Sequence, residues 1–402
     1  MRFIICGVIA IFLPAFILNI FADLPEGFIS HSIFIGAVCY VFHLLLSHKL
    51  SNYPGKHENL ILLPSVIVTY SFSLVVITLF QVTYSVAYFV WHILLVIGLD
   101  YWSNRMKYSG PNPTIHYIPL GKAKNLEQIP NVNWVKLEDP NQVVSNIQTL
   151  VADLYSPKLT DEWERFISKQ TLAGVDTYNV RQIRESLTGR TKITHMYEND
   201  LGSLQPSVAY LRTKQFIDSV LVLLSFPIVL PVMLITAILI KLESEGPVLF
   251  IQKRIGQKGE EFSIYKFRSM CKDSEKDGAK LASVGDMRVT RVGKFIRKTR
   301  IDELPQFFNV LKGDMALIGP RPEQKAFVEQ FDQNIPFYSY RHIVKPGITG
   351  WAQVTHGYAA TEDETQVKIE HDFYYIRHFS FALDVLIFFK TIQTMLTGFG
   401  AR

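Results

Sequence analysis

Cysteine is scarce in this chain. Only three occur among its 402 residues, Cys6, Cys39 and Cys271, and their spacing fits neither a disulfide framework nor a zinc site. This argues against a disulfide-stabilised secreted domain and agrees with a reducing compartment. Glycine-rich phosphate loops are also missing after the strands expected below, so nothing but fold analogy would support dinucleotide binding.

Charge is sparse as well. Only 19% of the residues are charged and 48% are hydrophobic, which indicates that part of the chain lies in lipid. Residues 3–21 and 33–47 carry no formal charge, and residues 60–99 form an uncharged run of about 40, long enough for two helices of about 20 residues each. The sequence therefore predicts four transmembrane helices within residues 1–105.

Basic residues orient these helices. Lys49 and Lys56 follow the second expected span, and Arg105 and Lys107 follow the fourth. By the positive-inside rule these ends, the N-terminus and the rest of the chain lie in the cytoplasm. Acidic residues follow the first span in place of a small-residue cleavage site, so we expect a retained span and not a signal peptide. His43 and His92 lie within spans, and hydrogen-bonded structural roles are expected for them.

A more polar segment, residues 111–205, resembles a small α/β cytoplasmic domain. Short apolar runs at residues 115–120, 134–137 and 175–180 are typical of strands. Thr160 has the character of an N-cap, and Trp163, Phe166 and Ile167 share one face of the helix that would follow. We expect a structural or regulatory role for this domain.

A second apolar element begins at about residue 214. Residues 219–240 are uncharged, but Pro227 and Pro231 each remove a backbone hydrogen bond from the middle of the run. One reading is a fifth span bent by proline. Basic residues flank both ends, however, so both ends prefer the cytoplasmic side. We therefore favour a re-entrant membrane helix over about residues 214–242, broken at the prolines.

The positive charge lies after this element. Residues 241–345 hold 20 basic and 14 acidic residues, a net charge of +6, and the rest of the chain has −1. Basic side chains recur at helical spacing opposite Val289, Val292 and Ile296, which predicts an amphipathic helix on an anionic membrane surface. Nucleic acid is not expected as a partner, because aromatic residues are sparse among these charges.

Asp302 and Glu303 are adjacent acids in this basic region. Pro305 suits the first turn of a helix and Gly313 its end, so residues 306–312 should be helical, with the acids at its start. Helix N-termini attract anions, and magnesium (Mg2+) is held by carboxylates together with substrate phosphates. One acid could attack phosphorus while the other holds metal, although spacing alone does not assign these roles.

Four motifs then carry a resemblance to a known family. They are IQKRIG at 251–256, FSIYKFRSM at 262–270, RIDELPQFFNVLKGDMALIGPRP at 300–322 and VKPGITGWAQV at 344–354. In this order, after a proline-containing apolar helix, they resemble the bacterial sugar transferases, which are polyprenyl-phosphate hexose-1-phosphate transferases or monotopic phosphoglycosyl transferases. The resemblance covers residues 212–402, and the preceding spans and α/β segment resemble those of the family's large members.

The resemblance implies an enzyme that transfers hexose-1-phosphate from a UDP-sugar to undecaprenyl phosphate, releasing UMP, and so starts exopolysaccharide or capsule synthesis. Asp302 matches the nucleophile, which forms a phosphosugar-enzyme intermediate, and Glu303 matches the magnesium ligand. Arg321 matches a phosphate-binding arginine and Lys266 another active-site position; a phosphate-binding role for Arg268 is extended from its charge. At the helix break, Pro231 matches the family's proline.

Two departures from the family pattern are visible. Leu230 precedes Pro231, where serine is frequent, and THGY follows WAQV from Thr355, where Asn-Gly is frequent. The second departure leaves donor recognition open.

The sequence thus predicts a multi-pass protein of the bacterial inner membrane, with an α+β catalytic domain at residues 212–402 on the cytoplasmic face. The resemblance to the family's large members also implies a homodimer. The alternative is a non-catalytic membrane regulatory or assembly protein that binds nucleotide-sugar or polyprenyl phosphate. The intact pair Asp302 and Glu303 favours the enzyme, because a binding module has no need of a nucleophile beside a metal ligand.

Overall fold

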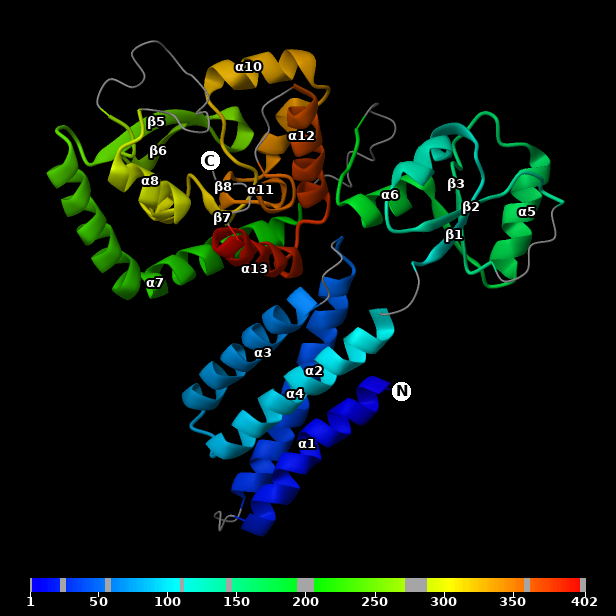
Figure 1. The fold of residues 1–402 in the computed structure, drawn as a ribbon, viewed down its shortest axis with the longest axis horizontal. Coiled ribbons are helices and arrows are strands. Elements are labelled where there is room, and N and C mark those ends of the chain that lie inside the picture. Colours follow the sequence, from blue (N-terminus) through cyan, green and yellow to red (C-terminus); the bar gives the residue numbers. More distant parts are fainter. Residues whose placement is uncertain are drawn as a thin grey trace. The chain divides into compact units, whose positions relative to one another are not determined.

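The chain divides into two compact units. A computed structural model describes residues 2–21, 27–54, 59–108, 112–141, 147–193, 206–271, 288–357 and 362–397. Internal contacts separate Met1–Gly189 from Arg190–Arg402. Each unit has hydrophobic clusters of its own. Figure 1 shows the helices and strands of which the units are built.

Four long helices begin the first unit. They are α1 (Arg2–Phe21), α2 (Phe28–Ser51), α3 (Asn59–Leu79) and α4 (Val86–Tyr108). Each is long and apolar enough to cross a membrane. Ala10, Cys39, Leu62 and Val96 share one buried cluster, whereas many of the outward side chains are exposed and apolar. The helices have the character of a membrane protein; the number and direction of crossings stay predictions.

Two histidine side chains inside this helical part are hydrogen-bonded to other residues. His43 Nε2 lies 2.6 Å from Asp100 Oδ2, and both residues are buried. His92 Nδ1 donates to the carbonyl oxygen of Ala10 at 2.7 Å. These bonds support the structural roles expected for the two histidines, because a buried polar group is costly unless it is hydrogen-bonded.

A parallel sheet follows in the same unit. Its strand order is β2-β1-β3-β4. The strands and helices are β1 (Thr114–Tyr117), η1 (Gly121–Gln128), β2 (Asn133–Lys136), β3 (Thr149–Ala152), α5 (Asp161–Leu172), β4 (Asp176–Asn179) and α6 (Val180–Thr188). The three expected strands form, and α5 begins after Thr160. Residues 194–205 of the expected α/β domain lie outside the described residues, so its boundaries stay predictions.

The second unit mixes helices with two small sheets. Its elements are α7 (Val208–Glu243), β5 (Leu249–Ile255), η4 (Gln257–Gly259), β6 (Glu261–Phe267), α8 (Arg291–Lys298), η5 (Ile301–Glu303), α9 (Gln306–Lys312), β7 (Ala316–Ile318), α10 (Lys325–Asn334), η6 (Tyr338–Ile343), β8 (Gly347–Thr349), α11 (Trp351–Thr355), α12 (Glu362–Arg377) and α13 (Phe381–Thr397). β5 pairs with β6 antiparallel, and β7 with β8 parallel. Val222, Ile264 and Val310 join α7, β6 and α9 in one core.

The helix α7 corrects one expectation. Pro227 and Pro231 lie inside a continuous helix, so the expected break is a bend; Figure 1 shows α7 turning sharply along its length. Each proline removes one intrahelical hydrogen bond, and the remaining bonds keep the backbone helical. Large apolar side chains around the bend are exposed: Leu221, Leu223, Leu224, Ile228, Leu230, Leu234 and Ile235.

Both halves of α7 attach to the rest of the second unit. In the first half, Lys214 Nζ lies 2.8 Å from Asp384 Oδ2, and Asp218 Oδ2 accepts from the backbone N–H of Leu317 at 3.0 Å. At the other end, Glu243 Oε1 accepts from the N–H of Arg291 at 2.8 Å. A straight helix of 36 residues would be about 54 Å long, so the bend returns the second half to the same unit.

The helix α8 occupies part of the expected amphipathic segment. Its apolar side chains Val292 and Ile296 pack against Ile240 of α7 and Phe267 of β6. This side therefore faces protein and does not face lipid, contrary to the expectation for a helix lying on a membrane surface. Among its apolar side chains, Phe295 is exposed.

Candidate active site

Asp302 and Glu303 are the last two residues of η5, the short turn that precedes α9. Arg300 introduces this turn at φ +59°, a left-handed conformation that non-glycine residues seldom adopt. Pro305 caps α9, which ends at Gly313 with φ +87°, so the expected helix 306–312 is confirmed. Asp302 is 9% exposed and Glu303 6%. The short turns thus hold two carboxyl groups inside the protein.

Asn309 of α9 connects this helix to the strand β6. Its Nδ2 donates to the carbonyl oxygen of Ser263 at 2.7 Å, and its Oδ1 accepts from the N–H of Tyr265 at 3.1 Å. Asn309 is fully buried. These two bonds fix α9 against β6 and thereby place Lys266, the next residue of the strand, beside Glu303.

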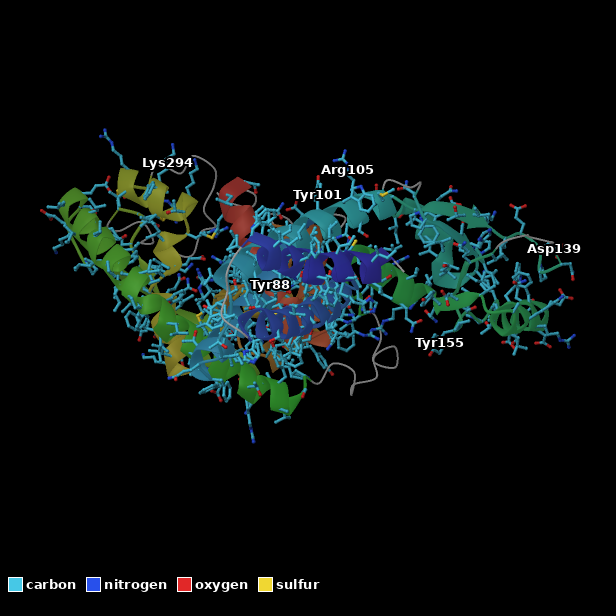
Figure 2. The ribbon with its side chains drawn as sticks, turned by 90° about the horizontal axis from the view of Figure 1, so that it is seen from below. Tyr88, Tyr101, Arg105, Asp139, Tyr155 and Lys294 are labelled. Carbon is cyan, nitrogen blue, oxygen red and sulfur yellow. The ribbon has the colours of Figure 1, made fainter. Side chains whose placement is uncertain are left out.

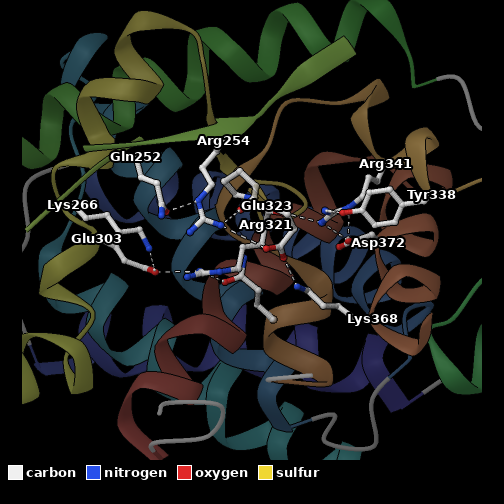
Figure 3. Close-up of polar contacts among 12 residues, drawn as sticks. Gln252, Arg254, Lys266, Glu303, Arg321, Glu323, Tyr338, Arg341, Lys368 and Asp372 are labelled. Atoms are coloured by element: carbon white, nitrogen blue, oxygen red, sulfur yellow. Dashed lines mark hydrogen bonds and ion pairs between the residues drawn. The ribbon is translucent and has the colours of Figure 1, made fainter. Parts of the chain in front are cut away.

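Three cations surround Glu303. Its Oε1 lies 3.1 Å from Arg321 Nη1, 3.4 Å from Lys266 Nζ and 3.8 Å from Arg300 Nη1. Figure 3 shows Lys266 and Arg321 converging on this carboxylate. Burial alone would raise the pKa of Glu303, but these cations, led by Arg321, lower its pKa to about 2. Glu303 is therefore ionised at every physiological pH.

Asp302 has the opposite environment. Burial and then the charge of Glu303 raise its pKa to about 6, against the pull of Lys266 and nearby arginines. Its Oδ1 is buried and has no hydrogen-bond partner among the described residues. A carboxylate that is ionised at neutral pH, is more basic than usual and has one oxygen free of hydrogen bonds is chemically suited to nucleophilic attack.

Arg321 is itself held in place. Its Nη1 also lies 3.2 Å from Gln353 Oε1 on α11. Its carbonyl oxygen accepts from Nη2 of buried Arg341 at 2.8 Å, and Arg341 pairs with Asp372 at 2.8 Å. Figure 3 shows this second group of contacts beyond Arg321. Asp302 and Glu303 are called the dyad below. A guanidinium held beside this dyad suits phosphate binding, because its planar N–H groups match the positions of phosphate oxygens.

The segment between β7 and Arg321 lies in close backbone contact with the segment around Gly347. A Cβ atom on Gly319 would collide with the backbone of Lys345 and Gly347. Gly319 N–H donates to Thr349 O at 2.9 Å, and Gly347 N–H donates to Pro320 O at 2.9 Å. Glycine is needed here because two chain segments cross without space for a side chain.

The structure brings together four of the expected site residues, Asp302, Glu303, Lys266 and Arg321. Arg268 is not among the described residues that contact Glu303, and its side chain donates to Ser244 at the end of α7 instead. Sequence reasoning did not assign Arg300 or Gln353, which bring charge and a hydrogen bond to the site. Both lie within the quoted motifs, but motif membership does not say which way a side chain points.

The dyad is compatible with one magnesium ion held jointly with a substrate. The described residues include no cluster of three or more His, Cys, Asp and Glu side chains that could hold a metal. All the ion pairs of Glu303 use Oε1. In the part of the chain that is described, Oε2 of Glu303 and Oδ1 of Asp302 are left without such contacts, and magnesium typically takes one or two carboxylates plus phosphate oxygens.

Comparison with known proteins identifies close relatives. A family model for bacterial sugar transferases matches residues 209–398. A UDP-N-acetylgalactosamine-undecaprenyl-phosphate N-acetylgalactosaminephosphotransferase of Aeromonas hydrophila is 50% identical over 370 residues, covering 91% of this chain and 86% of that protein. A UDP-glucose:undecaprenyl-phosphate glucose-1-phosphate transferase of Klebsiella pneumoniae is 39% identical over 220 residues, covering 54% of this chain and 46% of that protein.

Proposed function

The chain belongs to the bacterial sugar transferase family, and we propose that it transfers a hexose-1-phosphate from a UDP-sugar to undecaprenyl phosphate, with release of UMP. The observation that carries this proposal is the pairing of unlike carboxyl groups, Asp302 with a raised pKa and Glu303 held ionised by three cations. Groups whose environments push their pKa values apart are typical of catalytic sites. The same observation favours an enzyme over a non-catalytic regulatory or assembly protein.

The proposed reaction has two steps. A carboxylate oxygen of Asp302 attacks the phosphorus that carries the sugar, the bond from this phosphorus to the UMP oxygen breaks, and a covalent phosphosugar intermediate on Asp302 forms. This intermediate is an acyl phosphate, a mixed anhydride of the Asp302 carboxylate and the sugar phosphate. An oxygen of undecaprenyl phosphate then attacks the same phosphorus and displaces the Asp302 carboxylate. The lipid diphosphate sugar leaves, and the free carboxylate is regenerated.

The surrounding cations have defined tasks in this scheme. Arg321 and Lys266 offset the charge of the diphosphate as it approaches two carboxylates, and Arg300 adds to the same field. Magnesium, held by Glu303 and substrate phosphate, would supply charge neutralisation of the leaving UMP. The fixed ion pair with Glu303 keeps Arg321 in position before the substrate arrives.

We also propose that α7 is a re-entrant helix. Its two halves are attached to the same catalytic unit, while the bend exposes large apolar side chains such as Leu224 and Ile228. A helix that enters one leaflet and returns satisfies these contacts and the flanking positive charge. The protein is then a multi-pass protein of the bacterial inner membrane with its site at the cytoplasmic face, and we retain a homodimer as an expectation.

The donor proposed first is UDP-N-acetylgalactosamine. The relative from Aeromonas hydrophila, whose name specifies this donor, matches along 91% of the chain. The relative from Klebsiella pneumoniae, whose name specifies UDP-glucose, matches along 54%. The longer match supports the amino sugar.

A test of the proposed function uses the full-length chain in detergent with Mg2+. Radiolabelled UMP should exchange into UDP-N-acetylgalactosamine without any acceptor, because the first step is reversible by itself. Labelled sugar phosphate should then move to added undecaprenyl phosphate. Transfer without exchange would favour direct displacement, and neither reaction with any of several UDP-sugars would refute the proposal.

A further inference from the structure

The guanidinium of Arg268 is buried and largely unpaired. Arg268 is 8% exposed. Its Nη2 donates to the carbonyl oxygen of Ser244 at 2.8 Å and to Ser244 Oγ at 2.9 Å. Its Nε and Nη1 atoms are buried and have no hydrogen-bond partner among the described residues. A buried cation with two unmet donors is costly unless an anion compensates it.

Nearby carboxylates among the described residues do not neutralise the positive charge of Arg268. No described carboxylate lies within ion-pair distance of Arg268. Glu243, next to Ser244, uses both carboxylate oxygens to accept from the N–H groups of Arg291 and Val292 at the start of α8. Gly246 lies against the guanidinium with φ +114°, and a Cβ atom there would collide with Nη1. The local chain is therefore shaped around a cation that it leaves uncompensated.

Arg268 lies between the dyad and the apolar helix. Its backbone N–H donates to Val248 O at 2.9 Å, which continues the pairing of β5 with β6 by one residue. Arg268 and Lys266 therefore point to the same face of the strand, about 7 Å apart along it. Lys266 contacts Glu303, whereas Arg268 contacts the end of α7, whose last turns expose Ile238, Leu239 and Leu242.

We propose that Arg268 binds the phosphate of the polyprenyl acceptor. This inference rests on the proposed function and extends it by assigning separate cations to the two substrates. The acceptor is a lipid, so it approaches along the apolar surface of α7, and its phosphate meets Arg268 before it reaches Asp302. Arg321, held by Gln353 of α11 and by Glu303, serves the donor diphosphate. Within the described part of the chain, Nε and Nη1 of Arg268 are both free to donate to a phosphate oxygen, and a charge-assisted hydrogen bond of this kind is stronger than a neutral one.

The test separates the two half-reactions. Arg268→Gln should raise the KM for undecaprenyl phosphate about ten- to a hundredfold, the effect of losing a hydrogen bond to a charged group. Exchange of labelled UMP into the UDP-sugar, measured without acceptor, should change far less. Arg268→Lys keeps the charge and loses the directed N–H groups of the guanidinium, so its acceptor KM should lie between those of the wild type and Arg268→Gln.

The matched control is Arg297→Gln. Arg297 donates from Nε to Ser269 Oγ at 2.9 Å, so this variant removes a neighbouring arginine that also bonds a serine. Its acceptor KM should stay near the wild-type value. Equal loss of exchange and transfer in both Arg268 variants would overturn the inference, and so would an unchanged acceptor KM. A wild-type protein inactive in both reactions would instead refute the proposed function itself.

Discussion

Arg321 Nη1 donates to Glu303 Oε1 at 3.1 Å, so the cation expected to bind phosphate already pairs with the carboxylate expected to hold metal. The two residues come from η5 and from the segment after β7, and 17 residues separate them in the sequence. Substrate phosphate must therefore join an existing charge cluster. Removal of Asp302 and removal of Glu303 should therefore affect the reaction differently.

Asp302→Asn should abolish turnover and exchange, because the amide cannot replace the attacking carboxylate. Glu303→Gln should retain a residual rate, reduced roughly a hundredfold, with a weaker dependence on Mg2+. Steady-state transfer at several magnesium concentrations measures both effects. Substantial turnover by Asp302→Asn would exclude the assigned nucleophile.

Activity should decline on the acid side with a midpoint at about pH 6, the pKa of Asp302. The sign follows from the chemistry, since the carboxylate must be ionised to attack and protonation below its pKa removes the nucleophile. Glu303 titrates at about 2 and does not contribute in this range. The measurement is the pH profile of UMP exchange.

The variant Glu303→Gln tests whether Asp302 causes the decline of activity at acid pH. The negative charge of Glu303 raises the pKa of Asp302, so its removal should move the acid limb of the residual activity to lower pH. A limb that stays in place, or moves to higher pH, would show that another group controls the decline.

Asn309→Leu should destabilise the catalytic unit by about 1–3 kcal/mol, because the Tyr265 N–H and the Ser263 carbonyl lose their buried partner. Thermal unfolding in detergent measures this change. Lys294→Gln, on the exposed side of α8, is the control and should stay within about 0.5 kcal/mol. Equal effects of the two substitutions would show that Asn309 does not connect β6 to α9 as described.

The re-entrant topology can be tested by cysteine labelling. Cys271 is exposed and is first replaced by serine. Cysteines are then introduced singly at the exposed positions Thr213 and Glu245, near the two ends of α7. Both should react with a membrane-impermeant reagent only from the cytoplasmic side. Periplasmic labelling at position 245 would mean that α7 spans the membrane.

The proline pair gives a related expectation. Replacing Pro227 and Pro231 together by alanine should restore backbone hydrogen bonding and straighten α7. Activity should fall, although the groups around Asp302 are unchanged, because the second half of α7 no longer reaches α8 and β6. Full activity with unchanged labelling at position 245 would contradict a role for the bend.

Local signals made parts of this fold predictable. Pro305 and Gly313 delimit α9, and their backbone preferences act within a few residues. The strand β3 was not expected, and α6 was also missed although Asn179 and Gln182 form a capping box there. Such signals are weak in short elements.

The contacts within the site could not be predicted from neighbouring residues in the sequence. Lys266 and Glu303 are 37 positions apart, and they meet because buried Asn309 fixes β6 to α9. The sequence indicated their roles through family resemblance only. The apolar face of α8 shows the same limitation, since periodicity identifies such a face but does not say whether protein or lipid covers it.

The attachment of α7 near its start has a consequence for how the protein responds to its membrane. Lys214 pairs with Asp384, and Asp218 binds the backbone of Leu317 at the end of the core that contains α9. In the proposed topology, the depth of α7 in the leaflet therefore fixes the distance of Asp302 from the membrane surface. A thinner or thicker bilayer cannot be matched by sliding α7 relative to the site, so the surrounding lipids must deform instead.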